Sequence, residues 1–313
     1  MARLNVKEPG MTITRQPFRG VADMPRIFDL VRAMPLSCRH VIDLPWRLSS
    51  PAIQEGRDAA YWEDAKEQVV GFAAWQYYWA TLDFFILPGP EGRAVETAIF
   101  AWADSRFRER DEERGHPLPY SAEYRDDDLE RLRLIESHGF TLNDDENGYV
   151  VLEHPLAPLA PVSSVPDGFT LRPLHGEQET AAYAEAHRAA FASTSMTPEW
   201  RARTLHMPQY LPELDLVVCA PDGTLVGFCV GWFEPSRRIA QVEPAGVHPH
   251  FQRLGLARIL LLEMLHRFKA LGAEKGLVET NLDRSSALRT YESVGFQQTH
   301  HIRRSEKWVN PHA

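Results

Sequence analysis

Residues Gln252 to Ala257 have the composition and the position of an anion-binding turn. They lie between an expected strand, 239–247, and an expected amphipathic helix that begins near Leu256. The first backbone N–H groups of a helix have no partners within it, so they are free to bind an anion such as phosphate. Gly255 leaves room for a ligand to approach the backbone, and Ala257 is small yet favours helix. The stretch predicts a site for a phosphate-bearing ligand.

The flanks of this turn strengthen the prediction. A glycine before a helix is on its own often only a turn. Here Pro249 ends the strand, residues 248–251 form the connection, and the helix carries one apolar stripe, made of Leu260, Met264, Phe268 and Leu271. Strand, turn and helix therefore follow one another in the order that phosphate binding requires.

Length and composition indicate a globular protein of two domains. The chain has 313 residues, of which 44% are hydrophobic and 25% charged, and the usual domain size of roughly 150 residues gives two domains. No apolar run approaches the roughly 20 residues of a membrane span, and residues 1–10 lack the apolar core of a signal peptide. We expect a cytoplasmic protein without membrane partners, either a monomer or a homodimer.

Several other classes of function are disfavoured. The net charge of −9 argues against a nucleic-acid partner, since phosphate backbones are bound by clustered Lys and Arg. The three cysteines, Cys38, Cys219 and Cys229, have no metal-ligand spacing, and two of them lie in apolar runs where we expect burial. The histidine pairs 248/250 and 300/301 lack further ligands nearby, so we predict no metal. A serine hydrolase is disfavoured because no Gly-x-Ser-x-Gly occurs.

The two halves of the sequence resemble each other at an offset of 156 residues. Val69-Val70-Gly71-Phe72 matches Leu225-Val226-Gly227-Phe228, and 135–140 (Ile-Glu-Ser-His-Gly-Phe) matches 291–296 (Tyr-Glu-Ser-Val-Gly-Phe). The stretch between the halves contains four prolines, which predicts a stiff linker. We predict domains at 1–154 and 169–313, joined by a Pro-rich linker at 155–168.

Hydrophobic periodicity predicts the same order of elements in each half. In the second half we expect strands at 169–172, 215–220, 225–233, 239–247, 276–281, 296–300 and 305–309. Helices are expected within 177–205 and at 256–271 and 285–294. In the first half we expect helices at 21–34, 91–110 and 127–137 among strands. The fold class is α/β, with two tandem mixed sheets, mostly antiparallel, flanked by helices.

The second half resembles the GNAT acyltransferase family. Its Gln/Arg-x-x-Gly-x-Gly/Ala signature is matched by Gln252, Gly255 and Ala257, preceded by Val247-His248-Pro249. Its C-terminal Tyr-x-x-x-Gly-Phe pattern is matched by Tyr291, Gly295 and Phe296, with Ala287 at the usual helix position. The resemblance covers roughly 169–309 and implies a sheet that binds acyl-CoA between two splayed central strands. The tandem arrangement resembles that of mycothiol synthases, in which one repeat is also degenerate.

The resemblance assigns roles to residues of this sequence. Acetyl-CoA is the expected cosubstrate, with its pyrophosphate held by the backbone of Arg253, Leu254, Gly255, Leu256, Ala257 and Arg258, next to Gln252. Ala245, Gly246 and Val247 are expected to bind the pantetheine arm and the acyl oxygen, and Asn281 and Ala287 to line it. Tyr291 is the expected acid that protonates the CoA thiolate. Glu243 is the candidate base, and the neighbouring Pro244 predicts a local irregularity of the strand that aims its side chain. An ordinary solvent-facing strand carboxylate is the alternative.

Departures from the family pattern occur in both halves. The family often has Asn where this chain has Arg284, three residues before Ala287, so Asn281 is expected to replace some of its hydrogen bonds. In the first half, Gly89-Pro90-Glu91 stands where a phosphate turn is expected. Pro90 lacks an N–H and Glu91 repels phosphate. Ile135 occupies the position of Tyr291 and has no proton to give. We expect the first half to be a degenerate copy.

The expected activity is transfer of an acetyl group from acetyl-CoA to a primary amine of a small molecule. An alkyl amine with a pKa near 10 is mostly protonated at pH 7, so the enzyme must remove a proton before the amine attacks. The alternative is a non-catalytic acyl-CoA sensor, which needs the phosphate turn but neither acid nor base. Trp46, Trp200 and Trp232 either line an acceptor pocket or fill the core.

Overall fold

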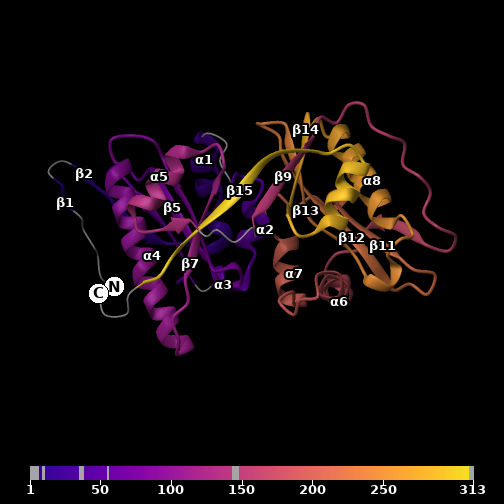
Figure 1. Ribbon diagram of the computed structural model, residues 1–313, viewed down its shortest axis with the longest axis horizontal. Coiled ribbons are helices and arrows are strands. Elements are labelled where there is room, and N and C mark those ends of the chain that lie inside the picture. The colour runs from indigo at the N-terminus through magenta and orange to yellow at the C-terminus, as the bar shows by residue number, and fades with distance from the viewer. Residues whose placement is uncertain (1–6, 9–10, 35–38, 55, 143–147, 310–313) are drawn as a thin grey trace. The chain divides into compact units, whose positions relative to one another are not determined.

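The computed structural model describes residues 7–8, 11–34, 39–54, 56–142 and 148–309, which belong to two compact units (Figure 1). Unit 1 contains Met1–Val41, Ser50–Asp145 and Ile302–Ala313, and unit 2 contains Ile42–Ser49 and Glu146–His301. Each unit has its own hydrophobic core. Two short strands, β1 (Lys7–Glu8) and β2 (Met11–Thr12), pair with each other.

Unit 2 contains six neighbouring strands in the order β10-β11-β12-β13-β14-β9. Its strands are β10 (Thr170–Pro173), β11 (Asp215–Cys219), β12 (Leu225–Glu234), β13 (Ile239–Val247), β14 (Lys275–Asn281) and β9 (Tyr149–His154). Only β13 and β14 run parallel; the other neighbours are antiparallel. The long strands are almost fully buried because helices cover both faces of the sheet.

Helix α8 (Leu256–Ala270) packs on one face of the unit 2 sheet, and α6 (Thr180–Phe191) and α7 (Pro198–Leu205) pack on the other (Figure 1). Alternate residues of a strand point to opposite faces. Accordingly, Gly231 approaches Met264 of α8, whereas the ring of Phe228 contacts Tyr183 and His187 of α6. A Cβ on Gly231 would lie 2.5 Å from the sulfur of Met264, so glycine is needed for this close packing. The last helix of the unit is α9 (Ser285–Ser293).

Unit 1 repeats this plan. Its sheet has the order β15-β7-β6-β5-β4-β3, from β3 (Thr14–Pro17), β4 (Ala59–Glu63), β5 (Val69–Gln76), β6 (Thr81–Ile86), β7 (Tyr120–Arg125) and the part of β15 (Gln297–Lys307) from Ile302 onward; β8 (Thr141–Leu142) also pairs with β15. Its helices are α1 (Met24–Ala33), α3 (Pro51–Gln54), α4 (Gly92–Arg114) and α5 (Leu129–Ser137). As in unit 2, the single parallel pair lies at the centre, between β6 and β7. The predicted α/β class and the predicted repeat are confirmed.

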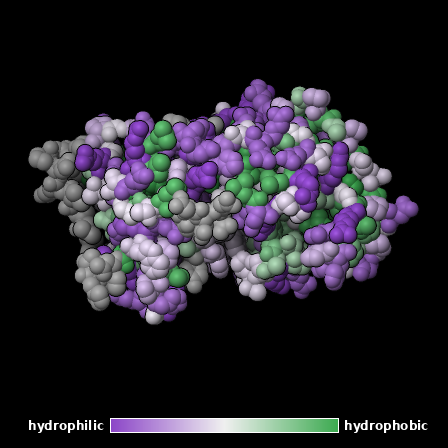
Figure 2. Space-filling view, in the orientation of Figure 1, coloured by the Kyte–Doolittle hydropathy of each residue, from purple (hydrophilic) through white to green (hydrophobic). Residues whose placement is uncertain are grey.

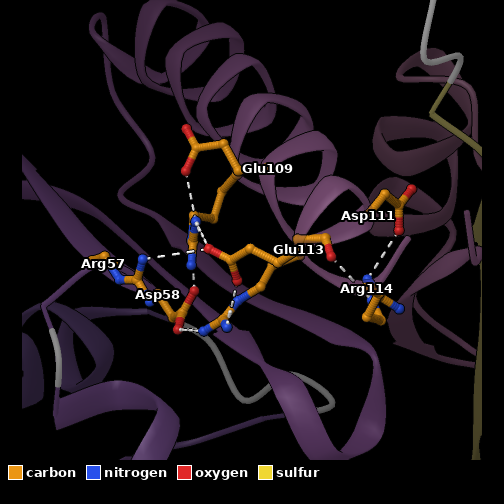
Figure 3. A network of polar contacts seen from close by, with 8 residues as sticks. Arg57, Asp58, Glu109, Asp111, Glu113 and Arg114 are labelled. Carbon is orange, nitrogen blue, oxygen red and sulfur yellow. Dashed lines mark hydrogen bonds and ion pairs between the residues drawn. The ribbon is translucent and has the colours of Figure 1, made fainter. Parts of the chain in front are cut away.

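The C-terminal half of α4 carries a network of ion pairs (Figure 3). Arg106 Nε lies 2.7 Å from Asp58 Oδ1, and Arg110 also pairs with the completely buried Asp58. Glu113 contacts Arg57 and Arg110 at the rim of the network. A buried carboxylate needs such partners because leaving it uncompensated is strongly destabilising. The network explains how a polar stretch of α4 is held against the start of β4.

The compact units differ from the predicted domains at their last strands. Residues 149–154, expected to end the first domain, form β9 and pair with β14 of unit 2. Residues from Ile302 onward, expected to end the second domain, pair with β7 of unit 1. The expected strands 296–300 and 305–309 are one strand, β15. Sequence periodicity predicts that a strand exists but not which neighbour it pairs with, because the hydrogen bonds come from the backbone.

Exposed hydrophobic side chains are scattered over the surface. On the face shown in Figure 2, hydrophilic residues separate the hydrophobic areas. Among the residues described, the large exposed ones include Leu254 and Trp308, at 45% and 63% exposure. None of the helices in the described part of the chain has both the length and the apolar composition that a membrane-spanning segment requires.

Candidate functional site

The turn before α8 has the geometry of an anion-binding nest. Helix α8 begins at Leu256 as predicted, with Gly255 at its N-cap. Both Arg253 and Gly255 have left-handed backbone angles, with φ of 66° and 79°. The first hydrogen bond of the helix runs from Ile259 N to Gly255 O at 3.1 Å. The N–H groups of residues 256–258 therefore have no hydrogen-bond acceptor within the helix, and Gly255 has no side chain to cap them.

This nest is accessible. Residues 252–255 are exposed, and a Cβ placed on Gly255 would meet no atom within 4 Å. Arg253 is exposed and Arg258 half-buried. The positive end of the helix dipole and open N–H groups together favour a phosphate group at this position.

The parallel ladder between β13 and β14 ends on the strand that leads to the nest. Its registered pairs run from Ile239 with Lys275 to Val242 with Val278. Beyond Val242, β13 continues for five residues to Val247 and pairs with β12 on its other side. Its edge towards β14 thus carries backbone groups that are outside the ladder. An extended, amide-containing ligand is suited to such an edge because it can bind as an additional strand.

A bulge lies in β13 where this gap opens. Cys229 of β12 pairs with Ala245, and Gly231 pairs with Val242. Between these two pairs, β13 therefore has one residue more than β12. The irregularity expected beside Pro244 is therefore present. It contains Glu243, whose backbone carbonyl accepts a hydrogen bond of 2.7 Å from Trp232 Nε1. Bulges redirect side chains and backbone groups at functional sites, and this one fixes the half-buried Glu243.

Tyr291 lies on α9 and is 9% exposed. Burial raises the pKa of its hydroxyl far above the usual value, and the nearby Cys229 and Glu243 raise it further. The phenol is therefore protonated at neutral pH. The influence of Glu243 on this pKa also shows that the predicted acid and the predicted base lie within electrostatic reach of each other.

Gly246 has a packing role that the sequence did not reveal. A Cβ at this position would lie 2.7 Å from the Phe228 ring and 2.9 Å from Ala190 of α6. The absence of a side chain thus allows α6 to approach the strand. Its neighbours Ala245 and Val247 are half-buried and pack against the core beneath α8.

The remaining predicted residues lie at the ends of β14 and α9. Asn281 is the last residue of β14, and Ala287 is half-buried in the first turn of α9. Arg284, which departs from the family pattern, is exposed and places its guanidinium 5.1 Å from the centre of the Phe191 ring. Gly295 has a φ of 104°, and a Cβ there would lie 2.8 Å from His154. This glycine of the C-terminal motif is therefore required by the backbone turn.

A segment from the first half of the sequence is part of unit 2, which sequence reasoning missed. Helix α2 (Leu44–Leu48) stacks Trp46 on Trp200 of α7, with ring centres 5.5 Å apart. Ser49 Oγ accepts hydrogen bonds from Trp200 Nε1 and Thr204 Oγ1, at 3.0 and 3.2 Å. Trp46, Trp200 and Trp232 are all at most 4% exposed, so they fill the core. Helix α2 is too short for periodicity to predict it.

The same segment reaches the strand that carries Glu243. Asp43 Oδ1 accepts a 2.8 Å hydrogen bond from Gln241 Nε2, and both side chains are buried. His187 of α6 lies beside Trp46 with a ring separation of 6.1 Å. Burial lowers the pKa of His187 to about 4, with smaller effects from Arg201 and Arg188. The α6–α7 face of unit 2 is thus lined with buried polar and aromatic groups.

The corresponding turn in unit 1 lacks the nest. Helix α4 begins at Gly92, directly after Glu91, and neither Gly89 nor Gly92 has a left-handed backbone angle. Strand β6 pairs with β5 without a register shift, so it has no bulge like that beside Glu243. Ile135 is completely buried. The features that distinguish the site in unit 2 are therefore specific to that unit.

Two of the three cysteines lie in unit 2. Cys219 and Cys229 are buried free thiols, as predicted, and Cys38 lies outside the described residues. Burial raises the pKa of the Cys229 thiol well above its usual range. Among the residues that the structure describes, no three His, Cys, Asp or Glu side chains are grouped so that they hold a metal ion.

Comparisons with known proteins relate part of unit 2 to a protein family. Residues 180–296 match the model of the acetyltransferase (GNAT) family. A mycothiol acetyltransferase of Thermomonospora curvata is 33% identical over 139 residues, covering 44% of this chain and 46% of that protein. The chain thus matches about half the length of this curated relative. Residues 180–296, which match the family model, contain the nest, the bulge and Tyr291.

Solved structures share the fold over nearly the entire chain. A tandem GNAT protein from the clavulanic acid biosynthesis pathway has a TM-score of 0.65 at 14% identity, covering 96% of this chain and 99% of the other. A GCN5-related N-acetyltransferase from Sphaerobacter thermophilus has a TM-score of 0.62 at 20% identity, covering 96% of both chains. Residues 180–296 therefore form a domain of the GNAT acetyltransferase family, within a chain that has the fold of a tandem GNAT protein.

Proposed function

We propose that unit 2 binds acetyl-CoA and transfers its acetyl group to a primary amine of a small molecule by direct attack. The observation that carries this proposal is the end of the β13–β14 ladder at Val242 and Val278, on the strand that leads to the exposed nest at Gly255. The gap suits the amide-containing pantetheine arm, and the nest suits the pyrophosphate. The name of the curated relatives, mycothiol acetyltransferase, supports a small-molecule acceptor.

The proposed reaction needs a base on the acceptor side. Glu243 takes the proton from the ammonium group, directly or through water, and the free amine then attacks the thioester carbonyl. Glu243 lies in the bulge, at the point where the parallel ladder ends. A backbone N–H between Ala245 and Val247 stabilises the oxyanion of the tetrahedral intermediate.

Tyr291 completes the proposed reaction. When the tetrahedral intermediate collapses, the carbon–sulfur bond breaks and the CoA thiolate leaves with the electron pair. The Tyr291 hydroxyl, which is protonated at neutral pH, gives its proton to that sulfur. As the amide forms, its nitrogen loses its second proton, which restores the Tyr291 hydroxyl. The products are the N-acetylated amine and free CoA. A cytoplasmic location and a monomeric or dimeric state stay predictions from the sequence.

The second candidate is a non-catalytic acyl-CoA sensor, for which the nest and the gap suffice. Replacement of Tyr291 by Phe distinguishes the two functions. For an enzyme, release of CoA with a panel of amines falls by about 10- to 1,000-fold while the affinity for acetyl-CoA is kept. Unchanged turnover in Tyr291→Phe contradicts its role as the acid. Binding of acetyl-CoA without turnover of any amine by the unmodified chain favours the sensor.

A further inference from the structure

Unit 1 also has a point where its central parallel strands stop pairing. The ladder between β6 and β7 consists of Thr81 with Ser121 and Leu82 with Ala122. Ala122 and Val278 are 156 residues apart, which is the offset of the sequence repeat. The strands therefore separate at the same position of the fold in both units, so the gap alone does not explain why one unit and not the other is suited to acyl-CoA.

In unit 1 a side chain occupies the space between the separated strands. Arg131 of α5 donates from Nε to the carbonyl oxygen of Glu123 on β7 at 2.7 Å. Its Nη1 lies 3.4 Å from the carbonyl oxygen of Phe84 on β6, and its guanidinium is 3.9 Å from the centre of the Phe84 ring. Both carbonyl groups lie beyond the last pair of the ladder. A single guanidinium thus bridges the two strands and replaces the missing ladder bonds.

A second arginine reinforces this bridge. Arg39, which is 5% exposed, forms ion pairs with Glu123 on β7 and with Asp83 on β6, the latter at 3.9 Å. Asp83 Oδ2 also accepts a 2.9 Å hydrogen bond from Gln76. Both carboxylates are 3% exposed. A ligand entering this gap would separate buried charges from their partners, which is strongly unfavourable.

The repeat identifies the position that differs between the units. Arg131 and Ala287 are 156 residues apart, in the helices that follow β7 and β14 respectively. Ala287 is half-buried, and its methyl group packs against the core of unit 2. The site of the guanidinium in unit 1 therefore corresponds to a methyl group in unit 2. Glu123, whose carbonyl oxygen accepts the hydrogen bond from Arg131, has an equivalent in unit 2, Glu279. The two units therefore differ in the helix residue and not in this strand residue.

We propose that the residue at this helical position decides which unit accepts acyl-CoA: Arg131 closes the strand gap of unit 1, and Ala287 keeps that of unit 2 open. This inference rests on the proposed function for its unit 2 half. It explains how two copies of one fold, each with separated central strands, present only one gap to a pantetheine arm.

The test uses the full-length chain and acetyl-CoA in isothermal titration calorimetry. The unmodified chain binds one acetyl-CoA per chain. Ala287→Arg places the unit 1 side chain in unit 2 and lowers the affinity at least about 100-fold. Ser293→Arg is the matched control, because it adds the same charge at an exposed position of the same helix. It leaves the affinity within about two-fold.

Each outcome is decisive for one of the claims. If the unmodified chain binds two acetyl-CoA molecules and Gly255→Val still binds one, the claim that Arg131 closes unit 1 is wrong. Tight binding by Ala287→Arg, together with loss of binding in Gly255→Val, overturns the role of position 287 but leaves the proposed function intact. No binding by the unmodified chain overturns both. Ala287→Leu fills the gap without a charge and lowers the affinity as well, so the test does not depend on Ala287→Arg folding.

Discussion

Trp232 Nε1 donates a 2.7 Å hydrogen bond to the backbone carbonyl of Glu243, and this bond ties the bulge of β13 to β12. Trp232 is completely buried and pairs with Gln241 two residues before Glu243. The indole therefore fixes the backbone at the point where the strand leaves its parallel neighbour. A carboxylate on a rigid bulge is well placed to act on an acceptor amine.

Replacement of Glu243 by Gln is expected to lower kcat/KM by about 10²- to 10⁴-fold at pH 7, since it removes the base and keeps the shape. The activity that remains rises with pH towards the pKa of the amine near 10, because free amine then forms without a base. Steady-state rates of CoA release between pH 6 and 9 measure both effects. Glu274→Gln, at an exposed site, is the control and keeps normal rates. A Glu243→Gln protein with an unchanged pH profile contradicts the role of Glu243 as the base.

His187 is expected to make the stability of the protein depend on pH. Its pKa is lowered to about 4 in the folded chain, chiefly by burial, compared with about 6.5 when unfolded. Between pH 4 and pH 6.5, His187 is protonated in the unfolded chain and neutral in the folded chain. The stabilisation is therefore complete above pH 6.5 and is lost as the pH falls towards 4.

The loss amounts to about 2 kcal/mol at pH 5, from the 1.36 kcal/mol of each pKa unit. His187→Phe keeps an aromatic ring on Phe228 and lacks this proton, so its free energy of unfolding changes less between pH 7.5 and 5. Urea denaturation at both pH values measures the difference between the two proteins. An identical pH dependence in both would show that His187 is not the group responsible.

A fragment consisting of residues 155–313 is expected not to fold. It lacks β9, which pairs with β14 from Gly276 to Asn281. It also lacks Ile42–Ser49, which supplies the Trp46 ring and the partner of Gln241. Unit 2 would expose a central strand and lose a buried hydrogen-bonded pair. Circular dichroism and a cooperative thermal transition are the measurements, with the full chain as control. A cooperative, soluble fragment contradicts the division of the chain into these units.

Local features of the site were predictable because they depend on residues close in the sequence. Gly255 and the helix start at Leu256 follow from turn and capping rules, and the irregularity at Pro244 follows from the missing N–H of proline. The repeat predicted that Ile135 and Tyr291 occupy equivalent positions. The two α/β folds likewise follow from periodicity that is strong in the long helices and buried strands.

The features that were missed depend on contacts between distant residues. The pairing of β9 with β14, and the stacking of Trp46 on Trp200, join segments that are far apart in the sequence. The sequence alone gives no reason to expect Arg131 of α5 anywhere but on the solvent side of its helix. The structure shows that it bridges β6 and β7. Gly246 was expected in the ligand site, and the structure adds a packing role that the sequence did not reveal, because Ala190 and Phe228 lie against it.

The central claim is that acetyl-CoA binds at the nest before α8, and the most direct test is its dissociation constant for three valine variants. Gly255→Val and Gly223→Val both place a β-branched residue at a left-handed angle with no atom within 4 Å, so they carry the same backbone strain. Gly92→Val alters the equivalent turn of unit 1. Gly255→Val alone is expected to weaken binding at least about 100-fold. Loss of binding in Gly92→Val with normal binding in Gly255→Val would contradict the account and place the site in unit 1.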